Sequence, residues 1–262
     1  MSNQDRKAKA QAAAGSTGRG ANAVVIGGVV VIVAIVLVVG AVVVNSVRDS
    51  GGASELPQGV AAGEPLEPYA DANPPKDAPV VDVYEDFRCP ACKVYEEYLG
   101  GTVTELAQDG RIRLRIHLKT VIDSVTGGES SAVAGSSAVC ALDQGAWTGY
   151  HEALFALQPE SEDRSGFAEE TYTQAAERAG LSGDALDEWQ QCTDDGTYVD
   201  YVQGVDDATT EEGIRATPTV VVDGTQFNWS SVIDQQSGEV DTETLKQVLT
   251  SGDVPEDMVA TQ

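Results

Sequence analysis

The chain has 262 residues, which is enough for one domain or two small ones. Its 42 acidic and 16 basic side chains give a formal net charge of −26, which argues against nucleic acid or an anionic lipid surface as a partner. The paired acidic residues of the second half lack the spacing of a calcium loop, and we interpret them as solvated helix faces.

A long apolar stretch lies near the start of the chain. Residues 23–44 carry no charge, and this length suits a helix that crosses a bilayer. The preceding segment, residues 1–22, is basic, so the positive-inside rule places it in the cytoplasm and the rest of the chain outside. A cleaved signal peptide is the alternative, and it exports the same domain. We therefore expect a single-pass protein of the cell membrane with an extracytoplasmic domain.

Proline and glycine dominate the next segment. Residues 45–78 contain several of each, and these residues break any periodic pattern. We interpret the segment as a semi-flexible tether without a fold of its own, which lets the domain reach varied partners. The folded domain is expected over residues 79–262.

A Cys-x-x-Cys motif lies between a strand pattern and a helix pattern. Residues 80–84 form an apolar run typical of a buried parallel strand, and Cys89-Pro90-Ala91-Cys92 follows. At a helix start, free N–H groups and the helix dipole favour a thiolate at Cys89, and Pro90 suits the first helical position. Cys92 lies one turn deeper, where it can attack a mixed disulfide at Cys89. The motif predicts redox chemistry with these two cysteines as catalytic residues.

The four cysteines of the chain allow other interpretations. A structural zinc site would also need Cys140 and Cys192, but zinc sites usually bring a second closely spaced pair. We expect no metal and no cofactor. Four cysteines allow three pairings, and only one uses the motif, so we predict a structural disulfide between Cys140 and Cys192. A second redox-active pair is the alternative, although neither cysteine lies in a reactive motif.

A strand–helix–strand unit surrounds the motif. The helix is predicted over residues 90–108, with an interruption at Gly100-Gly101. Residues 111–118 alternate strictly between polar and apolar side chains, which predicts a strand with one lightly covered face. His117 shares the polar phase of this strand. We therefore interpret it as a surface residue rather than a catalytic base.

Helical patterns dominate residues from about 124 to 213, where glycines separate the segments. His151 lies in one of them, and we interpret it as an exposed helical residue rather than a metal ligand. A final helix is predicted over residues 242–249, capped by Asp241. The five helices predicted within the 124–213 region cover residues 131–142, 147–157, 169–179, 185–192 and 198–213.

Two short strands are predicted between these helical parts. Residues 216–224 and 226–229 are joined by Asp223-Gly224, a hairpin signal, so they should pair antiparallel. Pro218 lies at the start of the first strand, where a proline is tolerated. The residues alone leave open whether its peptide bond is cis.

A strand–helix–strand half with Cys-Pro-x-Cys, followed by a strand–strand–helix half that opens with Thr-Pro, is the layout of the thioredoxin fold. The chain resembles the DsbA-like branch, which consists of exported thiol–disulfide oxidoreductases with a helical insertion between the halves. The resemblance covers about residues 79–250 and rests on EDFRCPAC at 85–92 and ATPT at 216–219. The cysteine pair of the insertion and the N-terminal anchor look like membrane-tethered actinobacterial members. The implied fold is α/β, with a helical insertion at about 124–213 and one preceding transmembrane helix.

The resemblance also implies roles for individual residues. Cys89 would be the nucleophile and Cys92 the buried resolving thiol. Pro218 would be cis beside the disulfide, and Thr217 would offer its backbone to an extended client peptide as an added strand. The strand order 2-1-3-4 would place strand 111–118 at an edge.

One feature departs from the family. Strong oxidants of this family often carry a donor side chain between the two cysteines, whereas this chain has Pro90-Ala91. We expect Arg88 and the Thr217 hydroxyl to stabilise the thiolate instead, by charge or hydrogen bond.

Three functions fit this sequence. The first is an exported oxidase that introduces disulfides into reduced or unfolded secreted proteins and is reoxidised by a membrane partner of the DsbB or VKOR-like type. The second is an exported reductase or isomerase that works from the dithiol form. The third is a tethered chaperone-like binding module, whose function would survive replacement of Cys89 by serine.

Overall fold

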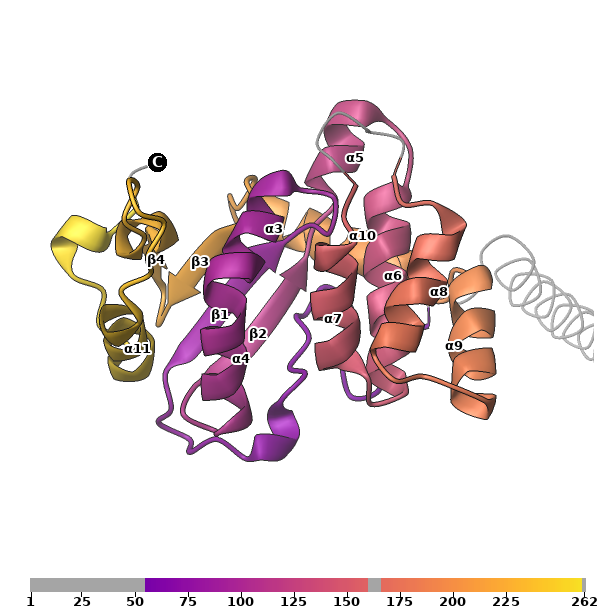
Figure 1. The fold of residues 1–262 in the computed structure, drawn as a ribbon, viewed down its shortest axis with the longest axis horizontal. Coiled ribbons are helices and arrows are strands. Elements are labelled where there is room, and N and C mark those ends of the chain that lie inside the picture. The colour runs from indigo at the N-terminus through magenta and orange to yellow at the C-terminus, as the bar shows by residue number, and fades with distance from the viewer. Residues whose placement is uncertain (1–54, 160–165, 261–262) are drawn as a thin grey trace, which may run out of the picture. The chain divides into compact units, whose positions relative to one another are not determined.

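A four-stranded sheet with the order β2-β1-β3-β4 forms the centre of the domain (Figure 1). The computed structural model describes residues 55–159 and 166–260. β1 pairs parallel with β2 and antiparallel with β3, and β4 pairs antiparallel with β3. The predicted order and the edge position of β2 are confirmed. The strands are β1 (Val80–Glu85), β2 (Arg113–Leu118), β3 (Thr219–Val222) and β4 (Thr225–Phe227).

The helical region after β1 consists of three consecutive parts. They are α3 (Pro90–Tyr95), the π-helical turn η2 (Glu96–Gly100) and α4 (Gly101–Gln108). The predicted interruption at Gly100-Gly101 coincides with the end of the π turn. A Cβ atom at Gly100 would collide with the Glu96 side chain, so glycine permits this local geometry.

The insertion between β2 and β3 is helical, and Figure 1 shows α6 to α9 on the side of the sheet remote from β4 and α11. All five predicted helices are present. A short additional helix, α5, was not predicted, because six residues are too few for a clear periodic pattern. The six helices are α5 (Val121–Thr126), α6 (Ser130–Asp143), α7 (Trp147–Ala156), α8 (Glu169–Arg178), α9 (Asp184–Asp194) and α10 (Val199–Glu211).

Polar contacts join the insertion to the sheet. α10 packs against β2 and α6. Lys119, directly after β2, is fully buried, and its Nζ lies 2.6 Å from Asp206 Oδ1 of α10. It also donates to the Thr209 hydroxyl at 2.7 Å. A buried ammonium requires such partners, so this cluster fixes α10 against the end of β2.

The second half of the thioredoxin layout follows the prediction. Asp223 and Gly224 both have positive φ and form the tight turn between β3 and β4. α11 (Thr242–Ser251) begins after Asp241, whose carboxylate accepts the N–H of Thr244. This helix packs against α4 and against the 3-10 turn η3 (Trp229–Val232).

Both edge strands of the sheet are paired with segments outside it. Leu66 is fully buried and exchanges two backbone hydrogen bonds with Ile116 of β2. Val259 forms a bridge with Phe227 of β4. The segment predicted as a tether therefore lies against the domain over residues 55–78, where it includes the 3-10 turn η1 (Ala70–Ala72). The rest of the predicted tether is outside the described residues.

Both histidines differ from the prediction, because both are buried. His117 Nε2 lies 2.7 Å from Asp82 Oδ1, and its ring stacks on Tyr84 with 4.1 Å between the centroids. His151 Nε2 lies 2.7 Å from Glu85 Oε1. In each case an acid on β1 provides the partner that makes burial of the imidazole tolerable. Sequence periodicity cannot reveal such pairing across elements.

Within residues 55–159 and 166–260, no helix is long and apolar enough to cross a membrane. The predicted membrane-spanning segment, residues 23–44, is outside the described part of the chain.

Candidate active site

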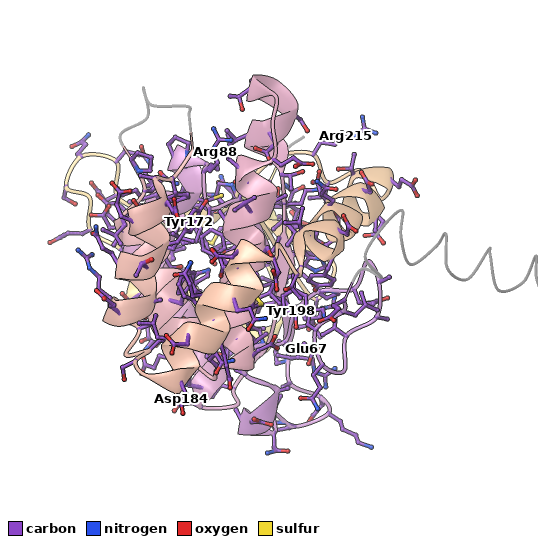
Figure 2. The ribbon with its side chains drawn as sticks, turned by 90° about the vertical axis from the view of Figure 1, so that its right-hand side faces the viewer. Glu67, Arg88, Tyr172, Asp184, Tyr198 and Arg215 are labelled. Atoms are coloured by element: carbon purple, nitrogen blue, oxygen red, sulfur yellow. A yellow bond between two sulfur atoms is a disulfide. The ribbon has the colours of Figure 1, made fainter. Side chains whose placement is uncertain are left out.

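Cys89 is the N-cap residue of α3, and Pro90 occupies the first helical position. The Cys89 carbonyl accepts the N–H groups of Cys92 at 3.0 Å and Lys93 at 3.2 Å. The first N–H groups of the helix, those of Ala91 and Cys92, lie at the same turn as the Cys89 sulfur and favour its thiolate. In Figure 2 the neighbouring Arg88 marks this end of the domain, opposite the end marked by Asp184 and Glu67.

The loop before β3 contacts the same sulfur atom. Cys89 Sγ lies 3.4 Å from the carbonyl oxygen of Thr217, and the Thr217–Pro218 peptide bond is cis. The Thr217 hydroxyl is buried and, apart from the Cys89 sulfur on which it acts, has no hydrogen-bond partner within the described residues. The structure thus brings Thr217 and Pro218 next to the two cysteines of the motif.

The two cysteines of the motif are free thiols with opposite acidities. The pKa of Cys89 is lowered to about 6, chiefly by a hydrogen bond from the Cys92 thiol. The Thr217 hydroxyl and the N–H groups of Cys92 and Ala91 act in the same direction, while burial opposes them. Cys89 is therefore largely a thiolate at neutral pH, which is the reactive form.

Cys92 is the deeper thiol. Only 1% of the residue is exposed, and burial raises its pKa well above its usual range. The Asp86 N–H lies 3.5 Å from its sulfur. A thiol of this kind stays protonated until a disulfide forms beside it. The two sulfurs thus differ in access and charge as an attacked and a resolving thiol must.

Asp86 is a buried acid beside the redox pair, and its place in the site is not evident from the sequence. Its carboxylate accepts the N–H groups of Arg88 at 2.8 Å and Ile122 at 2.9 Å. Burial nevertheless raises its pKa to about 7, and the nearby Cys89 charge adds to this rise. The signal in the sequence was an acidic pair, Glu85-Asp86, between an apolar strand and the motif.

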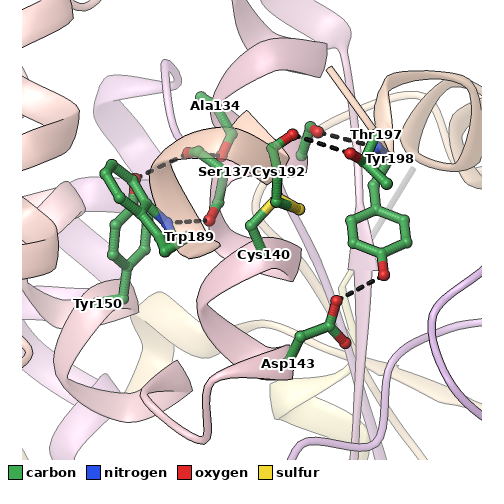
Figure 3. The surroundings of a disulfide bond; sticks show 10 residues. Ala134, Ser137, Cys140, Asp143, Tyr150, Trp189, Cys192, Thr197 and Tyr198 are labelled. Carbon is green, nitrogen blue, oxygen red and sulfur yellow. Dashed lines mark hydrogen bonds between the residues drawn. A yellow bond between two sulfur atoms is a disulfide. The ribbon is translucent and has the colours of Figure 1, made fainter. Parts of the chain in front are cut away.

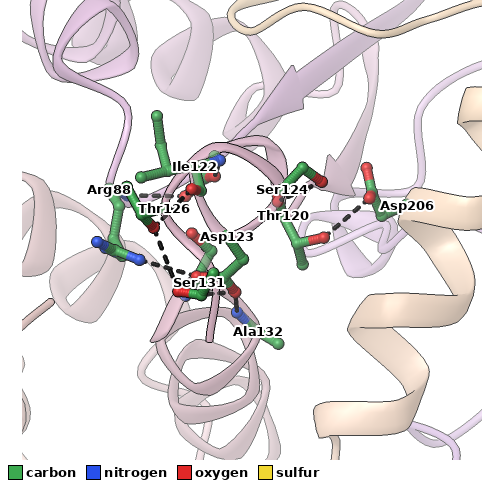
Figure 4. Close-up of polar contacts among 11 residues, drawn as sticks. Arg88, Thr120, Ile122, Asp123, Ser124, Thr126, Ser131, Ala132 and Asp206 are labelled. Atoms are coloured by element: carbon green, nitrogen blue, oxygen red, sulfur yellow. Dashed lines mark hydrogen bonds and ion pairs between the residues drawn. The ribbon is translucent and has the colours of Figure 1, made fainter. Parts of the chain in front are cut away.

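Arg88 is buried against the insertion (Figure 4). Its Nη1 lies 2.8 Å from Asp123 Oδ1, and Asp123 also accepts the N–H groups of Ser131 and Ala132 at the start of α6. The guanidinium thus links the redox loop to α5 and α6. The lowered pKa of Cys89 has its causes in Cys92, Thr217 and the helix start, so thiolate tuning by Arg88 stays a prediction.

Cys140 and Cys192 form a disulfide that joins α6 to α9, with 5.9 Å between the Cα atoms (Figure 3). Cys140 is fully buried. Trp189 Nε1 donates to the Ser137 carbonyl at 3.0 Å in the same layer. The predicted pairing is therefore present in the helical core. The zinc interpretation needs these two sulfurs as separate ligands.

A second buried polar cluster lies on the insertion side of α3. His151 contacts Glu85 on one side, and its Nδ1 lies 3.5 Å from Glu96 Oε1 on the other. Burial opposes a charge on His151, but the two carboxylates outweigh it and hold its pKa well above the usual range. An imidazolium between two acids makes this cluster a structural support for the end of β1.

The sheet order, the helical insertion, the cis proline and the free dithiol at a helix start define a dithiol protein of the thioredoxin fold. The sequence profile of the thioredoxin family matches residues 75–242, and the chain belongs to this family.

Solved structures similar to this chain include disulfide oxidoreductases of Mycobacterium tuberculosis. The reduced disulfide bond oxidoreductase DsbG of Mycobacterium tuberculosis is 30% identical, with a TM-score of 0.52, and the match covers 68% of this chain and 80% of that one. The oxidised DsbA of the same organism has the same identity and TM-score, over 68% and 85% of the two chains.

A more distant likeness concerns the fold alone. MdbA, a thiol-disulfide oxidoreductase of Actinomyces oris, is 21% identical with a TM-score of 0.55, and the match covers 78% of this chain and 98% of that one. Among curated proteins, none matches the chain.

Proposed function

We propose that the protein is an exported thiol–disulfide oxidase that introduces disulfides into reduced secreted proteins through Cys89 and Cys92. The observation that carries this proposal is the contrast between the two thiols. Cys89 is held as a thiolate chiefly by the Cys92 thiol, and then by Thr217 and the helix start, while Cys92 is buried and protonated. Stabilising the thiolate stabilises the reduced protein, and a stable reduced form makes the disulfide form a stronger oxidant.

The exchange reaction takes two steps. A client thiolate attacks Cys89 Sγ, the Cys89–Cys92 bond breaks, and Cys92 leaves with the electron pair and takes up a proton. The second client thiolate then attacks the client sulfur of the mixed disulfide, and Cys89 leaves as a thiolate. The client loses two electrons and gains one disulfide, and the enzyme ends as the dithiol.

The cis-proline loop supports binding of an extended client. Residues 216 and 217 precede β3, and the Thr217 carbonyl lies 3.4 Å from the reactive sulfur. A peptide that pairs with this backbone as an added strand would bring its own cysteine against Cys89. The acidic surface favours transient contacts with clients, because it resists non-specific adhesion.

Export and membrane attachment are part of the proposal. The uncharged residues 23–44 after a basic segment support a single N-terminal span with the domain outside the cytoplasm. The Cys140–Cys192 disulfide supports an oxidising compartment. Continued turnover requires a reoxidant, and we propose a membrane partner of the DsbB or VKOR-like type for this step.

The deciding experiment is the reduction potential of Cys89/Cys92. The protein is equilibrated in glutathione buffers, and its free thiols are counted by mass after alkylation. A reduction potential of about −120 mV supports the oxidase, and a potential of about −270 mV supports a reductase instead. Cys89→Ser abolishes either activity, while a chaperone-like binding function survives it.

A further inference from the structure

Gln158 reaches from the helical insertion to the backbone on both sides of the redox motif. It follows α7, and only 7% of the residue is exposed. Its Nε2 donates to the Phe87 carbonyl at 2.6 Å and to the Cys89 carbonyl at 3.1 Å. In return, Lys93 Nζ of α3 donates to the Gln158 carbonyl at 3.2 Å. Three hydrogen bonds therefore connect one residue of the insertion with the loop and helix that carry Cys89.

The bond to Phe87 satisfies a group that would otherwise be unpaired. Within the described residues, Gln158 is the partner found for the Phe87 carbonyl, and Phe87 is 1% exposed. A buried carbonyl without a partner costs free energy, so the loop would turn to find another donor if Gln158 were replaced. Gln158 holds the carbonyl side of the Phe87–Arg88 peptide unit, while Asp86 accepts its N–H group, so the two residues together fix the orientation of this unit just before Cys89.

Apolar contacts hold the same loop but leave its orientation open. The Phe87 ring packs against Phe155 of α7 with 4.7 Å between centroids and against His151 at 5.4 Å. Such contacts are non-directional, whereas the two bonds from one planar amide fix the directions of two carbonyls. Packing and hydrogen bonding therefore have separable effects at this position.

We propose that Gln158 is a positioning residue that holds Cys89 in its N-cap geometry from the side of the helical insertion. The inference rests on the proposed function and adds a residue to its machinery. Thr217 approaches the Cys89 sulfur from the sheet side, and Gln158 fixes the Cys89 backbone from the other. The reactive sulfur is thus placed jointly by the thioredoxin core and the insertion.

The position of Cys89 determines whether the N–H donors at the start of α3 can stabilise its thiolate. The N–H groups of Ala91 and Cys92 lower the pKa of Cys89 only while the residue keeps its N-cap conformation. Without Gln158 the Phe87 and Cys89 carbonyls lose a donor and the loop can shift within its remaining contacts, so these donors converge less closely on the sulfur. The thiolate is then less stabilised, and the disulfide becomes a weaker oxidant.

The test compares Gln158→Met with the matched variant Gln174→Met in the full-length reduced protein. Methionine keeps the length of glutamine but cannot donate, and Gln174 is an exposed glutamine of α8 in the same insertion. We expect Gln158→Met to raise the pKa of Cys89, followed by thiolate absorbance near 240 nm, by about one pH unit. The glutathione equilibrium constant should shift up to about tenfold, or about 30 mV, toward a weaker oxidant. Gln174→Met should leave both values unchanged.

An unchanged Cys89 pKa and potential in a folded Gln158→Met protein, even with a lowered melting temperature, would overturn the proposal and leave a purely structural role. If that variant does not fold, Gln158→Asn replaces it. Its amide is one methylene shorter, so a pKa equal to that of the natural protein would again contradict the proposal. Failure of the proposed function is distinguishable, because it would show in the potential and activity of the unaltered protein.

Discussion

Arg88 Nη1 lies 2.8 Å from Asp123 Oδ1, and the two side chains are 5% and 8% exposed. The ion pair connects the residue before Cys89 with α5. Asp123 also accepts the N–H group of Ser131 at the start of α6. Two buried charges of this kind are tolerated only together. The redox loop and the insertion are therefore coupled by charge as well as by the bonds of Gln158.

We expect Arg88→Met to destabilise the protein by about 3–5 kcal/mol, because it leaves the Asp123 carboxylate buried without its cation. Urea unfolding of Arg88→Met, Asp123→Asn and the double variant measures this loss. The double variant should lose less than the two single losses combined, since neither charge is then left alone. Full additivity would contradict a direct interaction. The same Arg88→Met protein tests thiolate tuning, through the pKa of Cys89.

The Cys140–Cys192 disulfide should contribute stability without redox activity. The bridged residues are 52 positions apart. Loop-closure entropy then gives a loss of about 4 kcal/mol for the Cys140→Ala/Cys192→Ala protein. We expect its Cys89/Cys92 potential to equal that of the natural protein. A large change in that potential or in turnover would favour the alternative of a second redox-active pair.

The low pKa of Cys89 should be visible in the pH dependence of the potential. Below about pH 6 reduction takes up two protons, and above it one, because Cys89 then remains a thiolate. The potential should fall by about 60 mV per pH unit below that point and by about 30 mV above it. A single slope of about 60 mV up to pH 8 would show that Cys89 is an ordinary thiol.

The lowered pKa of Cys89 also determines how the stability of the reduced protein changes with pH. The folded-state pKa of Cys89 lies below its ordinary value of 9.0. The thiolate therefore contributes stability that is fully present above about pH 9 and is lost as the pH falls through about 6. Between these limits the reduced protein should gain stability with rising pH relative to Cys89→Ala, as urea titrations at each pH will show.

Asp86→Asn should separate the two titrations near neutral pH. The pKa of the Asp86 carboxyl is raised to about 7, in part because the negative charge of the Cys89 thiolate disfavours a second negative charge nearby. Removing the carboxylate should lower the pKa of Cys89, and the thiolate absorbance curve should lose any second inflection near pH 7. A rise in the pKa of Cys89 would mean that Asp86 acts through its hydrogen bonds instead.

The structure could be predicted from the sequence where neighbouring residues alone determine the local conformation. The motif 89–92 combines a strand end, an N-cap position and a proline, and each favours the same turn, so the site and the 90–108 helix could be predicted. The alternation over 111–118 and the turn at Asp223-Gly224 predicted the sheet. The pairing of Cys140 with Cys192 followed because, of the three possible pairings of four cysteines, only this one keeps Cys89 and Cys92 together as the motif.

Contacts between distant elements could not be predicted. Asp82 pairs with His117 and Glu85 with His151, so polar residues that look exposed by period are buried. Gln158 lies at the end of a helix, where a polar residue is ordinary, and its role depends on a loop about 70 positions away. Such partners depend on tertiary packing, which one sequence without its fold does not define.

Leu66 forms a bridge with Ile116 of β2, and Val259 forms a bridge with Phe227 of β4, so each edge strand of the sheet is covered by the chain itself at one position. An enzyme that handles unfolded chains meets many extended segments that seek a free strand edge. With its own chain already in those positions, the domain leaves a client fewer places to adhere, and the backbone beside Pro218 stays open for productive pairing. Resistance to co-aggregation with its substrates is thus built into the same sheet that carries the reactive cysteine.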